Sequence, residues 1–229
     1  MYSERVKIIT FSGIDGAGKS TQIQALATWL RGAGFNLKQL SFWDDVVMFS
    51  RFREKTSQKV FRGEHGIGSP DNPVNRRDKN VTSWPVTGAR FCLYFFDALS
   101  LWRKVRQERK AAADVVIFDR YIYDELANLP LQRWGTRMFL SLLLRIVPLP
   151  DVAYVIDADP LAARQRKPEY PIEFIRKNRE AYLNLSSLIP GITVIAPLTI
   201  ENAETRVREV FLKSISIPPG CLAGLPAVQ

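Results

Sequence analysis

The stretch GIDGAGKST, residues 13–21, decides how this chain folds. Gly13, Gly18, Lys19 and Ser20 satisfy the spacing G-x-x-x-x-G-K-[ST] of a phosphate-binding loop, or P-loop. In such a loop, consecutive backbone N–H groups converge on phosphate oxygens, and the helix that follows points its positive N-terminus at them. We therefore expect this chain to bind a nucleoside triphosphate.

The segments on either side of the loop fit the same prediction. An apolar run at 6–11 predicts a buried strand, and apolar residues at helical spacing follow the loop over 22–30. Gly32 and Gly34 are suited to end that helix, and 36–42 predicts a second strand. Because strand, helix and strand alternate, the pattern predicts βαβ units in a parallel sheet.

The remaining chain continues this alternation. The pattern predicts strands at 114–119, 152–157 and 192–196, and helices at 86–112, 121–129, 131–147, 159 onward, 171–188 and 201–214. Residues 43–85 are less regular, with a short helix expected at 50–55, a loop at 63–70 and a polar cluster at 75–79. That stretch is either functional or a solvated surface insert. We expect one domain over 1–215 and a loosely packed tail over 216–229.

Composition narrows the functional classes. The 229 residues carry a formal charge of +9, which suits an anionic ligand such as a nucleotide, and no nucleic-acid-binding motif accompanies it. Cys92 and Cys221 are far apart, so a reduced, cytoplasmic protein is expected. His65 is the only histidine, which excludes a Ser/His/Asp triad and a zinc site built on several histidines. We expect neither a signal peptide nor a membrane span, because the start is polar and the most apolar stretch, 139–147, is short.

Several side chains outside the loop's glycines fit phosphoryl transfer. Lys19 can reach the outer phosphates of a triphosphate, and Ser20 can ligate Mg²⁺. Asp119 ends a predicted strand, where a carboxylate either holds Mg²⁺ or caps the next helix, and Arg120 beside it can clamp a phosphate. The basic cluster at 164–167 is either a mobile lid that brings Arg164 and Arg166 to the phosphates or an ordinary solvated charge run.

Taken together, these motifs resemble the thymidylate kinase family. The matching segments, which span most of the chain in order, are FSGIDGAGKSTQ at 11–22, FDRY at 118–121, DADP at 157–160, Phe174 and REAYL at 179–183. The resemblance implies a three-layer α/β P-loop NTPase fold, in which helices cover both faces of a parallel five-stranded sheet. It also implies ATP on the P-loop, Mg²⁺, and a nucleoside monophosphate opposite, most simply dTMP. Members are commonly dimers, so a homodimer is expected.

The resemblance also implies roles for individual residues. ATP would contact Gly13, Asp15, Gly16, Ala17, Gly18, Lys19, Ser20 and Thr21. Lys19, Asp119, Arg164 and Arg166 would serve the transfer, with lid arginines near 164–171, and Ser20 and Asp119 would hold the metal. Arg120 would bind the acceptor phosphate and Asp15 the acceptor sugar or a metal-bound water. Tyr121, Phe91 and Tyr94 are candidates for the acceptor side, with core packing as the alternative for the two residues of the long helix.

Two departures from the family pattern leave the acceptor open. Thymidylate kinases follow the second strand with an arginine, an acid and a Pro-Gly-Gly turn, whereas this chain has SFWDD at 41–45. They also carry an Asp-Arg pair in the long central helix, whose arginine helps to recognise thymine, whereas this chain has Asp97-Ala98. Three alternatives follow: a dTMP kinase, a kinase with another phosphorylated or hydroxylic acceptor, and an ATP-binding regulatory protein without turnover.

Overall fold

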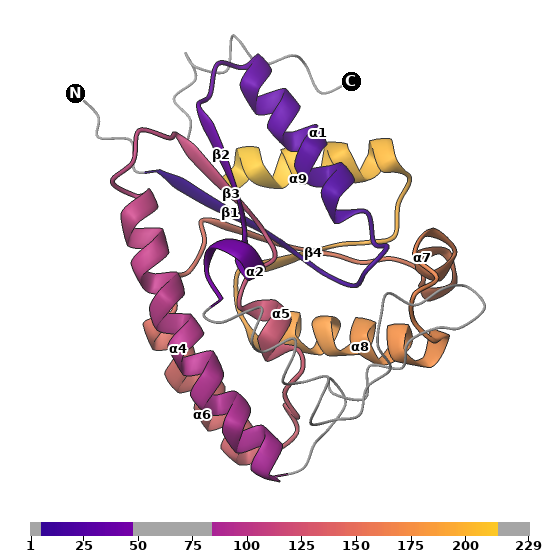
Figure 1. The fold of residues 1–229 in the computed structure, drawn as a ribbon. Coiled ribbons are helices and arrows are strands. Elements are labelled where there is room, and N and C mark those ends of the chain that lie inside the picture. Colours follow the sequence, from indigo (N-terminus) through magenta and orange to yellow (C-terminus); the bar gives the residue numbers. More distant parts are fainter. Residues whose placement is uncertain (1–5, 48–83, 215–229) are drawn as a thin grey trace.

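A five-stranded, entirely parallel sheet forms the centre of the molecule, as the sequence predicted (Figure 1). A computed structural model describes residues 6–47 and 84–214. The strand order is β2-β3-β1-β4-β5. The strands are β1 (Lys7–Ser12), β2 (Leu37–Ser41), β3 (Val115–Asp119), β4 (Val152–Ile156) and β5 (Ile192–Ile195). This is the parallel five-stranded α/β architecture expected of a P-loop NTPase.

Helices cover both faces of the sheet (Figure 1). α1 (Lys19–Gly32) and α9 (Ile200–Ser214) pack together on one face, whereas α4 (Trp84–Glu108), α6 (Trp134–Ile146) and α8 (Ile172–Leu188) lie on the other. Three short helices complete the fold: α2 (Phe42–Asp45), α5 (Tyr123–Leu126) and α7 (Pro160–Arg166). Within 6–47 and 84–214, no helix is both long and apolar enough to cross a membrane.

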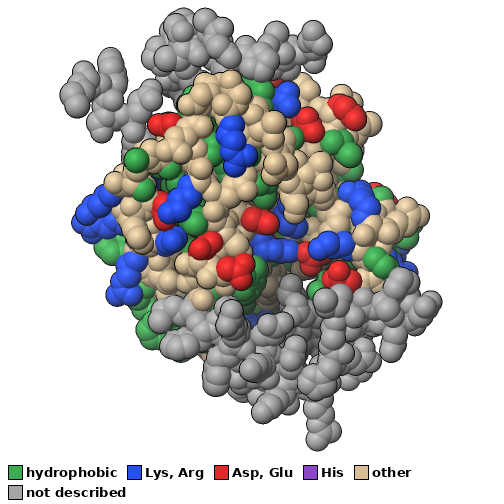
Figure 2. All heavy atoms as spheres, turned by 45° about the horizontal axis from the view of Figure 1, so that its top comes forward, with side chains coloured by type: hydrophobic (Ala, Val, Ile, Leu, Met, Phe, Trp, Pro, Cys, Tyr) green, Lys and Arg blue, Asp and Glu red, His purple; other side chains and the backbone are tan. Residues whose placement is uncertain are grey.

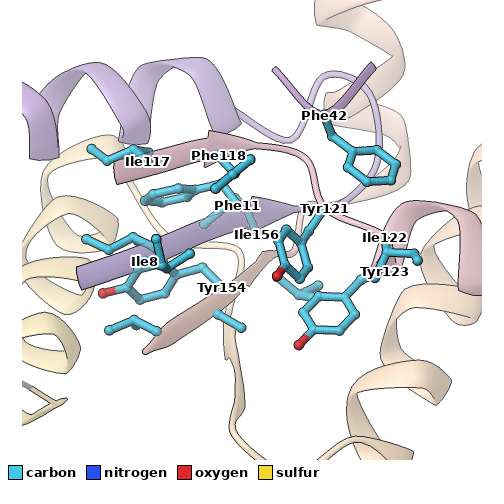
Figure 3. Packing of buried hydrophobic residues seen from close by; sticks show 14 of the residues in the cluster. Ile8, Phe11, Phe42, Ile117, Phe118, Tyr121, Ile122, Tyr123, Tyr154 and Ile156 are labelled. Atoms are coloured by element: carbon cyan, nitrogen blue, oxygen red, sulfur yellow. The ribbon is translucent and has the colours of Figure 1, made fainter. Parts of the chain in front are cut away.

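The central strands are apolar on both faces because helices cover both. In β1, Ile8, Ile9 and Phe11 are fully buried, and in β3 so are Ile117 and Phe118. The edge strands β2 and β5 keep several side chains partly open to solvent. Aromatic side chains fill the space between sheet and helices, as Figure 3 shows for Phe11, which lies 4.8 Å, ring centre to ring centre, from Tyr154. The core thus fixes the strand ends firmly against their helices.

Two of the predicted elements are wrong in detail. The helix predicted at 121–129 is only the single turn α5. Before it, Arg120 adopts a left-handed conformation (φ 69°), so the chain leaves β3 in a tight turn. Residues 128 and 129 donate three residues back, as in turns, and α6 begins at Trp134. A helical turn, α2, also forms where an irregular segment was predicted to begin, with Asp45 accepting from the Ser41 N–H at 2.7 Å. The predictions for 50–55, 63–70, 75–79 and 216–229 lie outside the described residues.

The carboxyl ends of the three central strands meet at one edge of the sheet. Strand register places Phe11 beside Asp119 and Ser12 beside Val155, so β1 ends between the ends of β3 and β4. The loop that follows β1 therefore lies next to the segments that follow β3 and β4. In an open parallel sheet this edge is where ligands bind.

Candidate active site

The glycines of the P-loop are required by close backbone contacts. Gly13, Gly16 and Gly18 have φ values of 136°, 81° and 93°, in the region that favours glycine. A Cβ on Gly13 would lie 2.4 Å from the Ile156 carbonyl oxygen, and one on Gly16 would lie 2.4 Å from the Ala163 carbonyl oxygen. The loop is therefore pressed against the end of β4 and against α7, with no room for a side chain at either position.

Lys19 turns back over the loop that precedes it. It is 7% exposed, and its Nζ donates to the carbonyls of Gly13 and Ile14, both at 2.9 Å. Burial, and then the nearby Arg120 charge, lower the pKa of Lys19 to about 8, against the opposing effect of three aspartates. An ammonium group in this state is charged at neutral pH but poorly solvated, so a phosphate placed beside it would be strongly stabilised.

Arg120 connects the P-loop to the segment after β3. Its backbone N–H donates to the Phe11 carbonyl at 2.9 Å, which fixes the turn. One end of the guanidinium, Nη1, donates to Asp124 Oδ1 at 2.7 Å, and the other, Nη2, donates to Asp15 Oδ1 within the loop. Burial alone would lower the pKa of Arg120, but Asp124, Tyr182 and Asp15 outweigh it and raise the pKa well above its usual value. The guanidinium is permanently charged and held between two carboxylates.

Asp124 is a functional candidate that the sequence analysis missed. Its Oδ1 accepts from Arg120 and from the Tyr182 hydroxyl at 2.6 Å, while its Oδ2 accepts from the Ser12 hydroxyl at 2.6 Å and the Tyr121 N–H at 3.3 Å. Burial, and then the Asp124 charge, raise the pKa of Tyr182 well above its ordinary value, so this hydroxyl stays a donor. No local sequence pattern indicated this contact, because Arg120 lies outside α5 and in a left-handed conformation.

A second ion pair fixes the end of β4. Arg179 of α8 donates to both oxygens of Asp157, from Nε at 2.6 Å and from Nη2 at 2.7 Å. Asp159 then caps α7, accepting from the N–H groups of residues 161 and 162 at 3.0 and 2.9 Å, with Pro160 in the first turn as predicted. These bonds hold the start of α7 against the P-loop.

The two lid arginines lie within α7. Arg166 is exposed, its Nε donates to the Ala162 carbonyl at 3.2 Å, and its Nη1 lies 3.8 Å from where a Cβ on Gly18 would be. Arg166 therefore extends over the loop, whereas Arg164 is only partly exposed and has no hydrogen-bond or ion-pair partner among residues 6–47 and 84–214. The basic cluster forms the end of a regular helix that contacts Gly16.

Ser20 and Asp119 are suited to a magnesium ion that is bound mainly through nucleotide phosphates. Ser20 is exposed and Asp119 partly exposed, and in the described part of the chain neither side chain has a hydrogen-bond partner. The described residues also contain no group of three or more His, Cys, Asp or Glu that could hold a metal by themselves. One hydroxyl and one carboxylate match Mg²⁺, which keeps several waters and takes few protein ligands.

Three predicted acceptor-side residues are not brought to this cluster. Tyr121 is fully buried and its hydroxyl donates to the Pro148 carbonyl at 2.5 Å, so the prediction of a direct substrate contact through its side chain is wrong. Figure 3 shows its ring among Phe42, Phe118 and Tyr123. Phe91 stacks on Phe139 of α6, with ring centres 4.1 Å apart, and Tyr94 is buried. Both belong to the core packing of α4, which was the stated alternative.

Ala17 and Thr21 are the remaining loop residues that were predicted to contact ATP. Ala17 is buried and its N–H donates to the Ile14 carbonyl at 3.2 Å, which closes the turn. Thr21 is exposed on the first turn of α1, where it lines a groove between α1 and α9. On the face shown in Figure 2, acidic side chains lie among the basic ones, so the positive charge does not form a single patch there.

Comparison with known proteins finds thymidylate kinases both among related sequences and among solved structures. The chain is 27% identical to a "Probable thymidylate kinase" of Thermococcus kodakarensis over 214 residues, covering 89% of this chain and 94% of the relative. It is 27% identical to one of Methanothermobacter thermautotrophicus, covering 93% and 97%. A crystal structure of thymidylate kinase from Ehrlichia chaffeensis superposes with a TM-score of 0.55 at 20% identity, covering 90% of this chain and 98% of the other. No family model matches the chain.

Proposed function

We propose that this chain, which is thymidylate kinase-like in sequence and in fold, is a nucleoside monophosphate kinase that transfers a phosphoryl group from ATP to dTMP. One observation carries the proposal: Arg120, a permanent cation, is in contact with Asp15 of the P-loop. A cation suited to an acceptor phosphate thus stands directly beside the loop suited to the donor. Phosphoryl transfer needs this proximity because catalysis rests on positioning and on charge stabilisation.

The donor side would be formed by the P-loop. The residues in question are Gly13, Asp15, Gly16, Ala17, Gly18, Lys19, Ser20 and Thr21. Lys19 would leave the carbonyls of Gly13 and Ile14 for the outer phosphates, and Arg166, already over Gly18, would follow the charge that develops in transfer. Ser20 and Asp119 would hold Mg²⁺, which when bound neutralises phosphate charge.

The acceptor side would be formed around Arg120. Its guanidinium presents a planar set of donors, a geometry that matches a phosphate better than an ammonium does. Because Asp15 occupies Nη2, the acceptor phosphate would replace Asp15 there and release this carboxylate toward the acceptor sugar or a metal-bound water. Binding of the acceptor would therefore change the P-loop, which links the two substrate sites.

Base recognition is where this chain departs from the family. Asp97 and Ala98, which stand where the family has its Asp-Arg pair, are both fully buried in α4. An alanine offers no donor to a base, so this base contact is lost. We expect discrimination among nucleobases to be weaker than in a thymidylate kinase with that arginine, since a missing hydrogen-bond reader costs selectivity.

A panel of acceptors tests the proposal. The purified chain is incubated with ATP, Mg²⁺ and dTMP, dUMP, dCMP or dGMP in turn, and ADP formation is followed. We expect turnover with dTMP and only modest preference over dUMP. If ATP binds in calorimetry but none of the four is phosphorylated, the chain is a kinase of another acceptor or an ATP-binding regulator, and the proposal fails.

We also propose a homodimer. Bulky apolar side chains lie exposed on α4 and α6, which pack against each other: Phe95, Phe96, Trp102, Trp134, Met138 and Leu142. Apolar surface exposed on neighbouring helices favours an interaction site. Light scattering should give twice the mass of one chain, and a single-chain mass would contradict the proposal. That nucleic acid is no partner and that the protein is cytoplasmic both stay predictions.

A further inference from the structure

We propose that Asp124 is a positioning residue for the acceptor site, which fixes the Arg120 guanidinium where the acceptor phosphate binds. The inference rests on the proposed function, and it concerns a residue that the P-loop and the Asp119-Arg120 pair leave unassigned. The side chain of Asp124 is 2% exposed, so it cannot itself reach a ligand in solvent. Among the described residues, the proposed site residue that it holds directly by an ion pair is Arg120, to which it is bound at 2.7 Å.

Asp124 is itself held in place from three separate elements. Ser12 at the end of β1 and Tyr182 of α8 donate to it at 2.6 Å each, and the Tyr121 N–H in the turn before α5 donates at 3.3 Å. Neither of its oxygens is free to turn elsewhere, since each accepts two of these four bonds, that from Arg120 included. A carboxylate bound this way has one orientation, and it imposes that orientation on Arg120.

The two carboxylates on Arg120 differ in what they can do. The Asp15 side chain is 22% exposed and belongs to the loop where the donor binds, whereas Asp124 is buried behind the guanidinium. A phosphate arriving from solvent can therefore displace Asp15 from Nη2 but cannot reach the bond at Nη1. Asp124 is the permanent partner, and Asp15 the exchangeable one.

A competing interpretation of the same contacts predicts the opposite sign. If Asp124 only neutralised Arg120, its removal would strengthen the attraction of Arg120 for a phosphate, and the KM for the acceptor would fall. If Asp124 positions Arg120, its removal frees a long side chain that must then be ordered by the ligand, and the KM rises. The buried location and the four donors favour positioning.

Steady-state kinetics with dTMP as acceptor separates these interpretations. Asp124→Asn keeps the size of the side chain but removes its charge, and we expect the KM for dTMP to rise about ten-fold, the loss expected for a charged hydrogen bond. The KM for ATP should change much less, because none of the hydrogen bonds of the Asp124 carboxylate goes to residues 13–21. Tyr182→Phe removes one of the four donors and should raise the KM for dTMP about three-fold. This second variant decides the question if Asp124→Asn does not fold.

Asp151→Asn is the matched control. Asp151 is a partly buried carboxylate, which accepts from the Ile8 N–H at 2.9 Å, but it lies at the opposite end of β1 and β4. Neither KM should change. A double variant, Arg120→Lys with Asp124→Asn, should be little worse than the worse single variant, because both changes act on one guanidinium. Additive losses would mean that Asp124 does not act through Arg120, and the inference would be overturned.

Chemical modification of arginines gives a second test, which does not require the protein to turn over a substrate. Phenylglyoxal modifies accessible arginines, and peptide mass spectrometry reports the rate at Arg120, with Arg179, which Asp157 holds, as internal reference. We expect Asp124→Asn and Tyr182→Phe to accelerate modification of Arg120 alone, and Asp151→Asn to change neither rate. If the unmutated chain fails to use dTMP while this pattern appears, the proposed function falls and the positioning of Arg120 stands. A lowered KM for dTMP, or an unchanged rate at Arg120, overturns the inference.

Discussion

The donor and acceptor sides that we propose for this site are built in different ways. The P-loop of the donor side is a single stretch, in which Gly13 to Gly18 follow β1 and Lys19 and Ser20 begin α1. The acceptor side is assembled from separate elements: Ser12 at the end of β1, Arg120 after β3, Asp124 in α5 and Tyr182 in α8. The difference shows that a short stretch of sequence can specify a backbone geometry, whereas a buried network of charged groups forms only in the complete fold.

Each side also tolerates change differently. The P-loop depends on the absence of side chains at Gly13 and Gly16, where a Cβ would meet a carbonyl at 2.4 Å. The acceptor side depends on the presence of particular side chains, which form hydrogen bonds and ion pairs with one another. We therefore expect the two sides to fail separately when they are mutated, and the following tests run from the largest expected effect to the smallest.

The largest loss of turnover is expected from a change on the donor side. Lys19→Ala removes the ammonium that would stabilise the transferring phosphoryl group, and turnover should fall by about 10³. Lys213→Ala, an exposed lysine in the last turn of α9, is the control and should leave turnover unchanged. Measured ADP production decides: if Lys19→Ala turns over like the unmutated chain, the P-loop is not the donor site.

The second-largest effect is expected at the two predicted lid arginines. Arg166→Ala should lower kcat about 10²-fold while ATP affinity stays within about three-fold, because the charge that Arg166 meets develops in transfer. Arg164→Ala should have the smaller effect, since only Arg166 lies close to Gly18. Arg176→Ala, an exposed arginine of α8, serves as control. Equal losses of kcat and of ATP affinity would contradict a role confined to the transition state.

The acceptor side should respond to a change that keeps its charge. In Arg120→Lys the planar set of donors is lost, so kcat/KM for dTMP should fall about ten-fold, with the KM for ATP as internal control. This result would confirm that the two sides are separable. If Arg120→Lys leaves every acceptor unaffected, the acceptor phosphate binds elsewhere.

The smallest effect is a pH dependence confined to the free enzyme. Lys19 has a pKa of about 8, so it is protonated below that pH and loses its charge as the pH rises through it. The value of kcat/KM for ATP, which reports the free enzyme, should therefore fall on the alkaline side and be about two-fold down at pH 8. With saturating ATP, phosphates raise the Lys19 pKa, and kcat should stay flat to higher pH. A parallel decline in both would assign the loss to another group.

Several features could be predicted because they are local or periodic. We predicted a parallel sheet with charged residues at one edge from the P-loop spacing, the strand before it and the Asp119-Arg120 pair at a strand end. The structure has this arrangement. The helix predicted at 121–129 was wrong at both ends: a left-handed turn at Arg120, bonded to Phe11 and Asp124, precedes α5, and residues 128 and 129 form turns after it. No local pattern reveals these contacts. Tyr121 was assigned to the substrate for a similar reason: only packing shows that its ring is buried.

The sequence by itself determined the donor loop, the order of strands and helices along the chain, and the residues that end the central strands. Glycine spacing and apolar periodicity act over a few residues, so they can be recognised in one dimension. Only the tertiary structure decided that Asp124, Tyr182 and Ser12 meet behind Arg120, and that Arg166 lies over Gly18. Such contacts form only when elements more than 50 residues apart in the sequence pack together. A charged group needs these partners because packing buries it, and a buried charge without a partner is costly.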